Sequence, residues 1–181
     1  GIPDEKSETC YVRVVDAAHP SDVNSISDEA KPFSIRPVIA VTAPVANQNV
    51  ELNAAADTTI TWNSNSSKVT KVDLYYSSTG SLGAFDKVIS TGVTSSQGSN
   101  SLTTWHPIAP GDVISADAVI KVRDKTNDIV NDNVYGLSAS FDILGKIVVS
   151  EPHLNENISS GGAKTISWTK YGTLGDVKLY Y

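Results

Sequence analysis

An oxygen-rich segment is the part of this sequence best suited to holding a metal ion. Its acidic residues stand four positions apart, at Asp124, Asp128 and Asp132, with asparagines between them. Calcium prefers carboxylate and amide oxygens, so these three residues are the calcium candidates. Their spacing does not match the Asp-x-Asx-x-Asx-Gly loop, and an aspartate that caps backbone N–H groups in a turn is the interpretation we favour. Calcium is the one cofactor that the sequence suggests.

Residues that could act as nucleophiles or general bases are few and isolated. His19, His106 and His153 stand in predicted loops or beside proline, and none belongs to a Ser/His/Asp or Cys/His arrangement. Cys10 is the only cysteine, and it occupies a strand position that favours small residues, as a buried and inert thiol does. The sequence also lacks a Gly-rich phosphate loop, His-Glu-x-x-His and Cys-x-x-Cys. We therefore predict no catalytic residues and no enzyme.

Two kinds of residue could take part in sugar chemistry. Tyr75 and Tyr180 are predicted to point outward from equivalent strands, where an aromatic ring could face a ligand. Asn65 and Asn157 begin Asn-x-Ser triplets, the acceptor pattern for N-glycosylation. Such triplets also arise by chance in Ser/Asn-rich sequence, so glycosylation is a hypothesis.

The overall composition limits the possible partners and location. The chain has 181 residues, 40% of them hydrophobic, with a net charge of −6 and a sequence pI of about 4.9. An acidic chain argues against nucleic-acid binding, and no apolar run approaches the roughly 20 residues of a membrane span. A single cysteine excludes a disulfide framework. Because there is no methionine and no signal pattern, we expect a mature fragment or an excised piece of a longer protein. One cysteine with many Ser, Thr and Asn residues suits an exported protein, so the expected location is extracellular, at the cell surface.

Comparison of the chain with itself reveals an internal repeat. The first matches are 108 residues apart, and later ones are 106 and 105 apart. The matching segments are 12–16 with 120–124, 33–35 with 141–143, 39–44 with 147–152, 59–62 with 165–168 and 72–76 with 177–181. A period of 105–108 residues exceeds the 20–50 residues of solenoid repeats, so each copy should be a whole domain.

The repeat divides the chain into three parts. Residues 36–143 form one complete copy, residues 1–35 the C-terminal half of a preceding copy, and residues 144–181 the N-terminal half of a following copy. Neither half can close a two-sheet core alone. We favour a longer parent protein that supplies the missing strands; the alternative is that the halves pair with each other, within the chain or between chains.

The fold prediction follows from alternating apolar residues. Apolar side chains recur at every second position in seven or eight short segments of the complete copy, and no sustained helical period occurs. This predicts an all-β protein of tandem immunoglobulin-like β-sandwiches, with Asp73 and Tyr75 outward. We interpret Trp62 and Trp168 as one core residue per copy, the alternative being a sugar platform. The predicted core is Ile60, Trp62, Val72, Leu74, Ile120, Val122 and Phe141.

These motifs together resemble a known family. They are Ile39-x-Val41-x-x-Pro44, Thr59-Ile60-Thr61-Trp62, Val72-Asp73-Leu74-Tyr75-Tyr76, Trp105-His106-Pro107, Ile120-Lys121-Val122-Arg123-Asp124 and Ser138-x-Ser140-Phe141-Asp142-Ile143. The pattern is similar to the Ser/Thr-rich cell-wall (Kre/Knh-like) Ig-like domain, which also occurs in tandem in large bacterial surface and S-layer-like proteins. The resemblance implies wall or surface architecture and no catalytic residues.

The predicted function is a non-catalytic structural segment of a large exported bacterial cell-surface glycoprotein, such as an S-layer or stalk. Its expected partners are neighbouring repeats, like chains in the surface assembly, and cell-wall or surface polysaccharide. Two alternatives stay open, namely a carbohydrate-binding or adhesive module and an accessory domain of a secreted polysaccharide-degrading enzyme.

Overall fold

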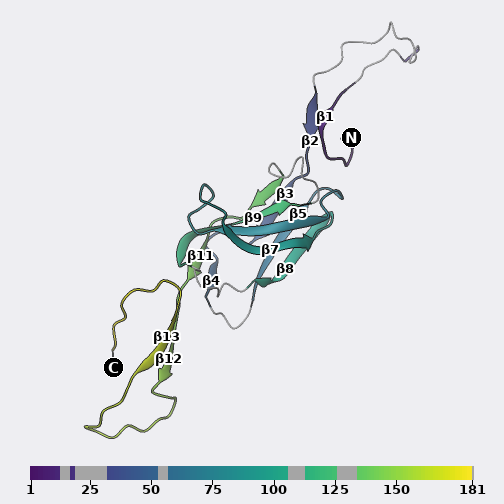
Figure 1. Ribbon diagram of the computed structural model, residues 1–181. Coiled ribbons are helices and arrows are strands. Elements are labelled where there is room, and N and C mark those ends of the chain that lie inside the picture. Colours follow the sequence, from purple (N-terminus) through teal and green to yellow (C-terminus); the bar gives the residue numbers. More distant parts are fainter. Residues whose placement is uncertain (13–16, 19–31, 53–56, 106–112, 126–133, 181) are drawn as a thin grey trace.

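The computed structural model describes residues 1–12, 17–18, 32–52, 57–105, 113–125 and 134–180 (Figure 1). All regular structure in these residues is β, as predicted, and they contain no helix. The strands are β1 (Ser7–Cys10), β2 (Phe33–Ile35), β3 (Ile39–Ala43), β4 (Asn49–Glu51), β5 (Thr58–Ser64), β6 (Lys71–Ser77), β7 (Lys87–Thr94), β8 (Gly98–Trp105), β9 (Ser115–Asp124), β10 (Tyr135–Leu137), β11 (Phe141–Leu144), β12 (Lys146–Glu151) and β13 (Ser167–Tyr171).

Strands β3 to β11 form the body of the molecule, which we call the central unit. A three-stranded sheet has the order β3-β5-β8, and a six-stranded sheet has the order β4-β11-β9-β6-β7 with β10 also paired to β9. Strand β9 is ten residues long, so one of its edges accommodates β11 near its start and β10 near its end. Its other edge pairs with β6. All these pairings are antiparallel except that of β4 with β11.

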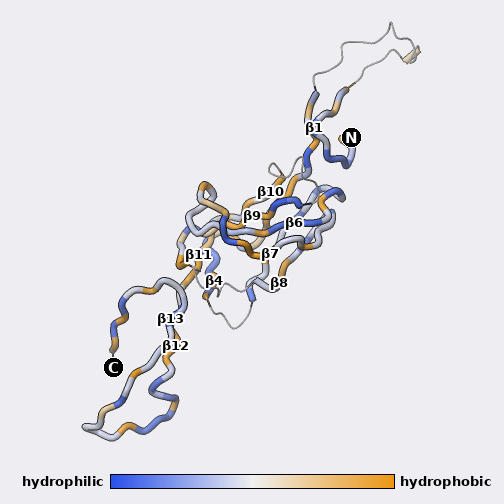
Figure 2. The backbone as a smooth tube through the Cα atoms, viewed as in Figure 1, coloured by the Kyte–Doolittle hydropathy of each residue, from blue (hydrophilic) through white to orange (hydrophobic). Residues whose placement is uncertain are grey.

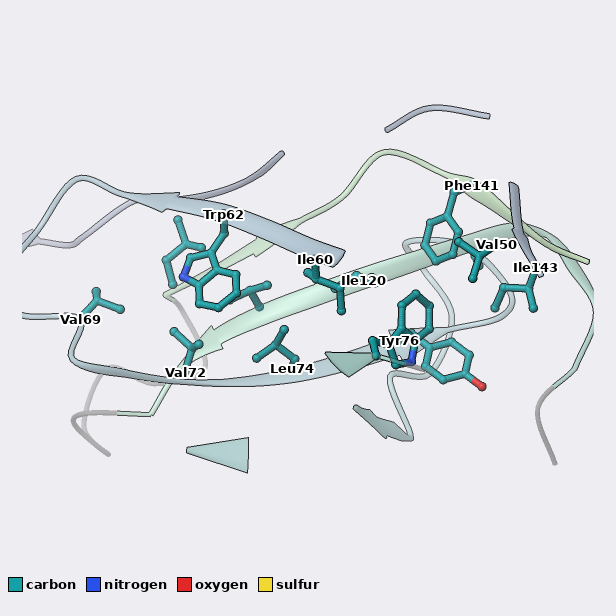
Figure 3. Close-up of a cluster of buried hydrophobic side chains, with 14 of the residues drawn as sticks. Val50, Ile60, Trp62, Val69, Val72, Leu74, Tyr76, Ile120, Phe141 and Ile143 are labelled. Atoms are coloured by element: carbon teal, nitrogen blue, oxygen red, sulfur yellow. The ribbon is translucent and has the colours of Figure 1, made fainter. Parts of the chain in front are cut away.

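The two sheets face one another across a single apolar core (Figure 3). All seven predicted core residues are 0% exposed, and they come from both sheets. Alternation explains this result, because successive side chains of a strand point to opposite faces. Each large side chain buried in this way contributes roughly 1.5–3 kcal/mol to stability. The arrangement is compatible with a β-sandwich.

The three tryptophans differ in burial. Trp62 is fully buried, and its indole N–H donates a hydrogen bond of 3.2 Å to Ser95 Oγ. Trp105 is also in the core, with its ring 5.7 Å from that of Tyr76 and 5.9 Å from that of Phe141. The prediction of a core residue is confirmed for Trp62. It is wrong for Trp168 in this structure, since Trp168 is half-buried on a hairpin that no second sheet covers.

Two hairpins extend from opposite ends of the central unit (Figure 1). Strands β1 and β2 form one, and strands β12 and β13 form the other. Their registers match those of the central unit at the repeat offsets. Cys10 pairs with Phe33 as Ala118 pairs with Phe141, and Val149 pairs with Trp168 as Val41 pairs with Trp62.

The irregularities of the hairpins recur as well. The register shifts between Ser7 and Cys10 and again between Val149 and Glu151. Shifts occur at the corresponding places between Phe141 and Ile143, where β11 pairs with β9, and between Val41 and Ala43. The same local sequence therefore produces the same pairing whether or not a second sheet is present.

One predicted strand does not form. Residues 177–180, which match the start of β6 in sequence, carry no strand in this structure. In the central unit β6 lies between β7 and β9, and the hairpin β12–β13 provides neither neighbour. A strand without a paired edge has few interactions to offset the entropy of ordering its backbone.

Candidate functional site: the two junctions of the central unit

The first junction is the place where the N-terminal segment meets the central unit. Asp4 Oδ1 accepts a hydrogen bond of 2.5 Å from Ser66 Oγ, and Asp4 Oδ2 accepts one of 3.0 Å from the Ser67 N–H. These bonds, led by that from Ser66, lower the pKa of Asp4 from 3.8 to about 2. The carboxylate therefore joins the segment before β1 to the loop that follows β5.

A buried ion pair reinforces the first junction. Lys6 Nζ contacts Asp124 Oδ2 at the end of β9, with side-chain exposures of 5% and 0%. Burying two charges is costly, and removing one partner of such a pair is more costly still, because the other charge stays in the interior. The neighbouring pair Glu5–Lys68 is exposed, at 3.7 Å, so it contributes little.

The hairpin β1–β2 has its own polar contacts beside this junction. Glu8 accepts hydrogen bonds from Arg36 Nη2, at 3.1 Å, and from Ser34 Oγ, at 2.9 Å. These contacts, with Arg36 first, lower the pKa of Glu8. A cavity of about 520 Å³ lies between the hairpin and the central unit, with Phe33 on one wall and Gln97 on the other.

The second junction, between the central unit and the hairpin β12–β13, is apolar. A Cβ built on Gly145 would lie 2.7 Å from Ile114 Cδ1 and 2.9 Å from Leu174 Cδ2. A Cβ built on Gly172 would lie 2.5 Å from Leu52 Cδ1 and 3.2 Å from Ile114 Cγ1. The two glycines thus let aliphatic side chains from both sides approach the backbone closely. Tyr171 also packs against the central core.

The two junctions occupy equivalent places in the sequence repeat. At an offset of 108, Lys6 corresponds to Ile114. At the offset of 106 that relates Trp62 to Trp168, Ser66 corresponds to Gly172 and Lys68 to Leu174. In both cases the segment before one strand contacts the loop after another strand, before β1 and after β5 at the first junction, and before β9 and after β13 at the second. Hydroxyl and charged groups occupy the first junction, and aliphatic groups occupy the second.

The predicted ligand-facing Tyr75 lies on the outer face of the six-stranded sheet. The Arg123 guanidinium lies 5.2 Å from the centre of its ring, and Arg123 Nη2 donates to Tyr75 Oη at 3.1 Å. Nearby, Lys121 Nζ lies 4.3 Å from the centre of the Tyr135 ring and 5.5 Å from that of Phe85. A hollow of about 140 Å³ is lined by Tyr75, Phe85, Lys121 and Arg123.

Asp73 lies beside Arg123 and Lys125 and is buried, although its strand position is outward. Burial raises its pKa, but the hydrogen bond of 2.8 Å from the Gly92 N–H, the hydrogen bond and charge of Lys125, and the hydrogen bond from Arg123 together outweigh burial, so the pKa is lowered overall. The carboxylate is therefore neutralised locally, and the outer face presents cations and aromatic rings to solvent.

The other residues predicted for a site do not form a common site where the structure describes them. Tyr180 is 85% exposed in the segment that forms no strand, so its predicted strand position is wrong. Asn65 and Asn157 are both exposed, and Asn65 Oδ1 accepts a hydrogen bond of 2.7 Å from the Val38 N–H. Asp124 is buried against Lys6, whereas Asp128 and Asp132 lie outside the described residues.

A group of possible metal ligands that the sequence did not suggest lies beside β12. Atoms of Glu151, His153 and Glu156 lie within 4.8 Å of one another. Lys164 Nζ already bridges the two carboxylates, at 2.7 Å from Glu151 and 2.5 Å from Glu156. The hydrogen bonds from Lys164 lower the pKa of both glutamates, and the one to Glu151 leads in raising the pKa of Lys164. The group is thus an ion-pair cluster that fastens the loop between β12 and β13.

Cys10 and the histidines are the remaining candidates for chemistry. Cys10, which was predicted to be buried, is half-buried in this structure and makes no disulfide. His19 and His106 lie outside the described residues, and His153 is the exposed member of the cluster above. In the part of the chain that the structure describes, no helix has the length and apolarity needed to cross a membrane.

The chain was also compared with known proteins. No family model matches it, and no curated protein does so either.

Proposed function

We propose that this chain is a non-catalytic structural segment of tandem immunoglobulin-like repeats in a large exported bacterial surface protein, such as an S-layer or stalk. The observation that carries the proposal is the recurrence of pairing registers. The hairpins β1–β2 and β12–β13 repeat the pairings of the central unit at the sequence offsets of the repeat. Each hairpin thus has the local structure of part of a further copy.

The topology supports the immunoglobulin-like assignment. Strands β3, β5 and β8 form one sheet, and the other has β6 and β9 at its centre with β10 and β11 following β9. Immunoglobulin-like sandwiches also place a sheet of early and middle strands against a sheet that contains the last strands, over a core with a buried tryptophan. Here Trp62 takes that place without a disulfide.

The fixed junctions support a role in keeping successive units at a constant spacing. Interfaces between domains of one chain usually permit relative motion unless they are large and well packed. Here the segment before β1 is fixed by Asp4 and by the buried pair Lys6–Asp124, and the second junction is packed with aliphatic groups. Fixed junctions between successive units suit an array that keeps its spacing.

Location of the native protein tests this proposal. Antibodies against the central unit, used with cell fractionation and immunoelectron microscopy, should label a regular outer layer or stalk. A cytosolic location would overturn the proposal, as would hydrolase activity of the parent protein that depends on residues of this segment. Mass spectrometry of the native protein would test N-glycosylation at the exposed Asn65 and Asn157.

A second candidate function is binding of acidic polysaccharide, favoured by the outer face of the six-stranded sheet. Two cation–aromatic groups, built on Arg123 and Lys121, border one hollow on an otherwise acidic protein. Affinity electrophoresis in a polyuronate gel, compared with a neutral glucan gel, tests it. The polyuronate should retard the chain and the K121Q variant should lose this retardation. Equal mobility in both gels would exclude this function.

A further inference from the structure

The hairpins carry the apolar residues of a core without burying them. Figure 2 shows hydrophobic positions spread along the hairpin β12–β13, outside the central unit. Their counterparts in the central unit are at most 4% exposed. The pairs, each with the residue outside the central unit first, are Phe33 41% and Phe141 0%, Ile147 45% and Ile39 4%, Ile158 50% and Val50 2%, Ile166 45% and Ile60 0%, and, in the segment after β13, Leu179 58% and Leu74 0%.

The two hairpins lack different halves of the same unit. The first repeats β9 and β11, which end the unit, and the second repeats β3 and β5, which begin it. In the central unit these halves meet where β11 pairs in parallel with β4, with Ile143 opposite Val50. The repeat places Ile35 and Ile158 in those two positions.

Within the described residues, neither partner in that expected pairing is occupied. Strand β2 pairs only with β1, which leaves its other edge without a strand, and residues 157–159 belong to no strand. The two hairpins also lie at opposite ends of the molecule (Figure 1). One chain in this arrangement therefore cannot bring them together.

We propose that the β1–β2 hairpin of a second copy of this chain docks onto the β12–β13 hairpin of the first, with Ile35 paired in parallel to Ile158. The proposal rests on the repeat in the proposed function, since the repeat identifies the matching halves. The contact joins two different surfaces, so each copy keeps one hairpin for a further partner. A heterologous contact of this kind builds an open chain of copies rather than a closed dimer.

Two variants of the full chain test this directly by analytical ultracentrifugation. Phe33→Asp places a charge on the first hairpin and leaves the second intact, and Ile147→Asp does the reverse. The unmodified chain should form oligomers that grow with concentration, and each variant alone should be monomeric. An equimolar mixture of the two variants should give a 1:1 dimer and nothing larger. Val88→Asp, at a residue of β7 that is 61% exposed, is the control and should associate like the unmodified chain.

Two native residues report which surfaces meet. Cys10 corresponds to Ala118, which is 0% exposed in the central unit, so docking should slow maleimide labelling of Cys10 at least tenfold in the Ile147→Asp copy of the mixture. Trp168 corresponds to Trp62, and acrylamide quenching of its fluorescence should fall in the Phe33→Asp copy. Circular dichroism of each variant confirms that the central unit is folded.

Several results would overturn the proposal. They are an unmodified chain that stays monomeric at all concentrations, a Phe33→Asp chain that still associates with itself, and a mixture of variants without a dimer. The proposed function has a separate test. A surface location with a monomeric chain would refute the docking alone, and polymers of a cytosolic protein would refute the function alone.

Discussion

The two junctions show how one place in a repeat can be filled by different chemistry. At the first junction, Asp4 and Lys6 reach the central unit through a carboxylate and an ammonium. At the second, Ile114 fills the position that Lys6 holds in the first, and glycine stands where Ser66 stands. The positions are related by the repeat, while the interactions are not.

The difference shows that segments at matching positions of the sequence can make contacts at matching places and yet be held by different interactions. The strength of ion pairs and hydrogen bonds depends on the pH and on whether each buried charge has a partner. Aliphatic contacts depend on shape, and so on the absence of a Cβ at two glycines. The two junctions should therefore fail under different perturbations, and this contrast can be tested one junction at a time.

The largest effect should follow loss of the Lys6 ammonium. Lys6→Met keeps most of the aliphatic stem but removes the ammonium group that contacts the buried Asp124 carboxylate. We expect a loss of about 3–5 kcal/mol in the free energy of unfolding, measured by urea denaturation. Glu5→Gln, which removes the exposed pair with Lys68, is the control and should change stability by less than about 1 kcal/mol. Equal effects of the two variants would contradict the buried pair.

Substitution of Gly172 should disrupt the second junction. Its φ is +88°, and a Cβ would lie 2.5 Å from Leu52 Cδ1. Gly172→Ala should therefore cost about 1–2 kcal/mol from backbone conformation alone and should push the loop after β13 off the central unit. Hydrogen exchange should speed up at 144–146 and 171–174 and stay unchanged at 4–6.

Two further glycines separate the causes of that effect. Gly161 has a φ of +77° with no atom within 4 Å of a built Cβ, and Gly175 has open space without a positive φ. Gly161→Ala should strain its own turn without releasing the second junction, and Gly175→Ala should do neither. Release of the junction by Gly161→Ala would show that the contact with Leu52 is not what holds it.

A smaller and selective effect is expected on lowering the pH. The folded pKa of Asp4, about 2, is below its ordinary value of 3.8, so its stabilising effect is complete above pH 3.8 and is lost as the pH falls towards 2. Exchange of the Ser67 amide proton, which bonds to Asp4, should accelerate in this range relative to the intrinsic rate. Asp4→Asn should remove this pH dependence. The apolar contacts of Ile114 and Leu174 should not respond.

Sequence alone predicted the core because alternation decides which face a side chain takes. Ile60, Leu74 and Phe141 are buried as expected. Alternation does not show what lies above a face. Asp73 was predicted to point outward, and it does lie on the outer side of its sheet, but Lys125 and Arg123 cover it there.

The junctions could not be predicted because they join residues distant in sequence with no motif between them. Lys6 and Asp124 are 118 positions apart, and Asp4 and Ser66 are 62 apart. The self-comparison contained one usable signal, since it relates Lys6 to Ile114 and Lys68 to Leu174, but it does not reveal that these positions touch. Tyr180 was misplaced for another reason, because a strand position has meaning only when a neighbouring strand is present to pair with it.

The smallest effect should come from Lys164, whose cluster fastens the loop of the β12–β13 hairpin away from both junctions. Its contacts with Glu151 and Glu156 are partly exposed and screened by solvent, so Lys164→Met should lower the stability only slightly. Its pKa is raised above 10.5, so this contribution is complete below pH 10.5 and is lost as the pH rises through the raised value. The lowered pKa values of the glutamates predict a second loss of stability as the pH falls below 4.5.

Hydrogen exchange at the Glu156 amide, which donates to the His153 carbonyl, should report both losses, while the Ser67 amide should report only the acidic one through Asp4. If Lys164→Met also released Gly172 from Leu52, the cluster and the second junction would be one cooperative element, and the division of the molecule into separately held contacts would be wrong.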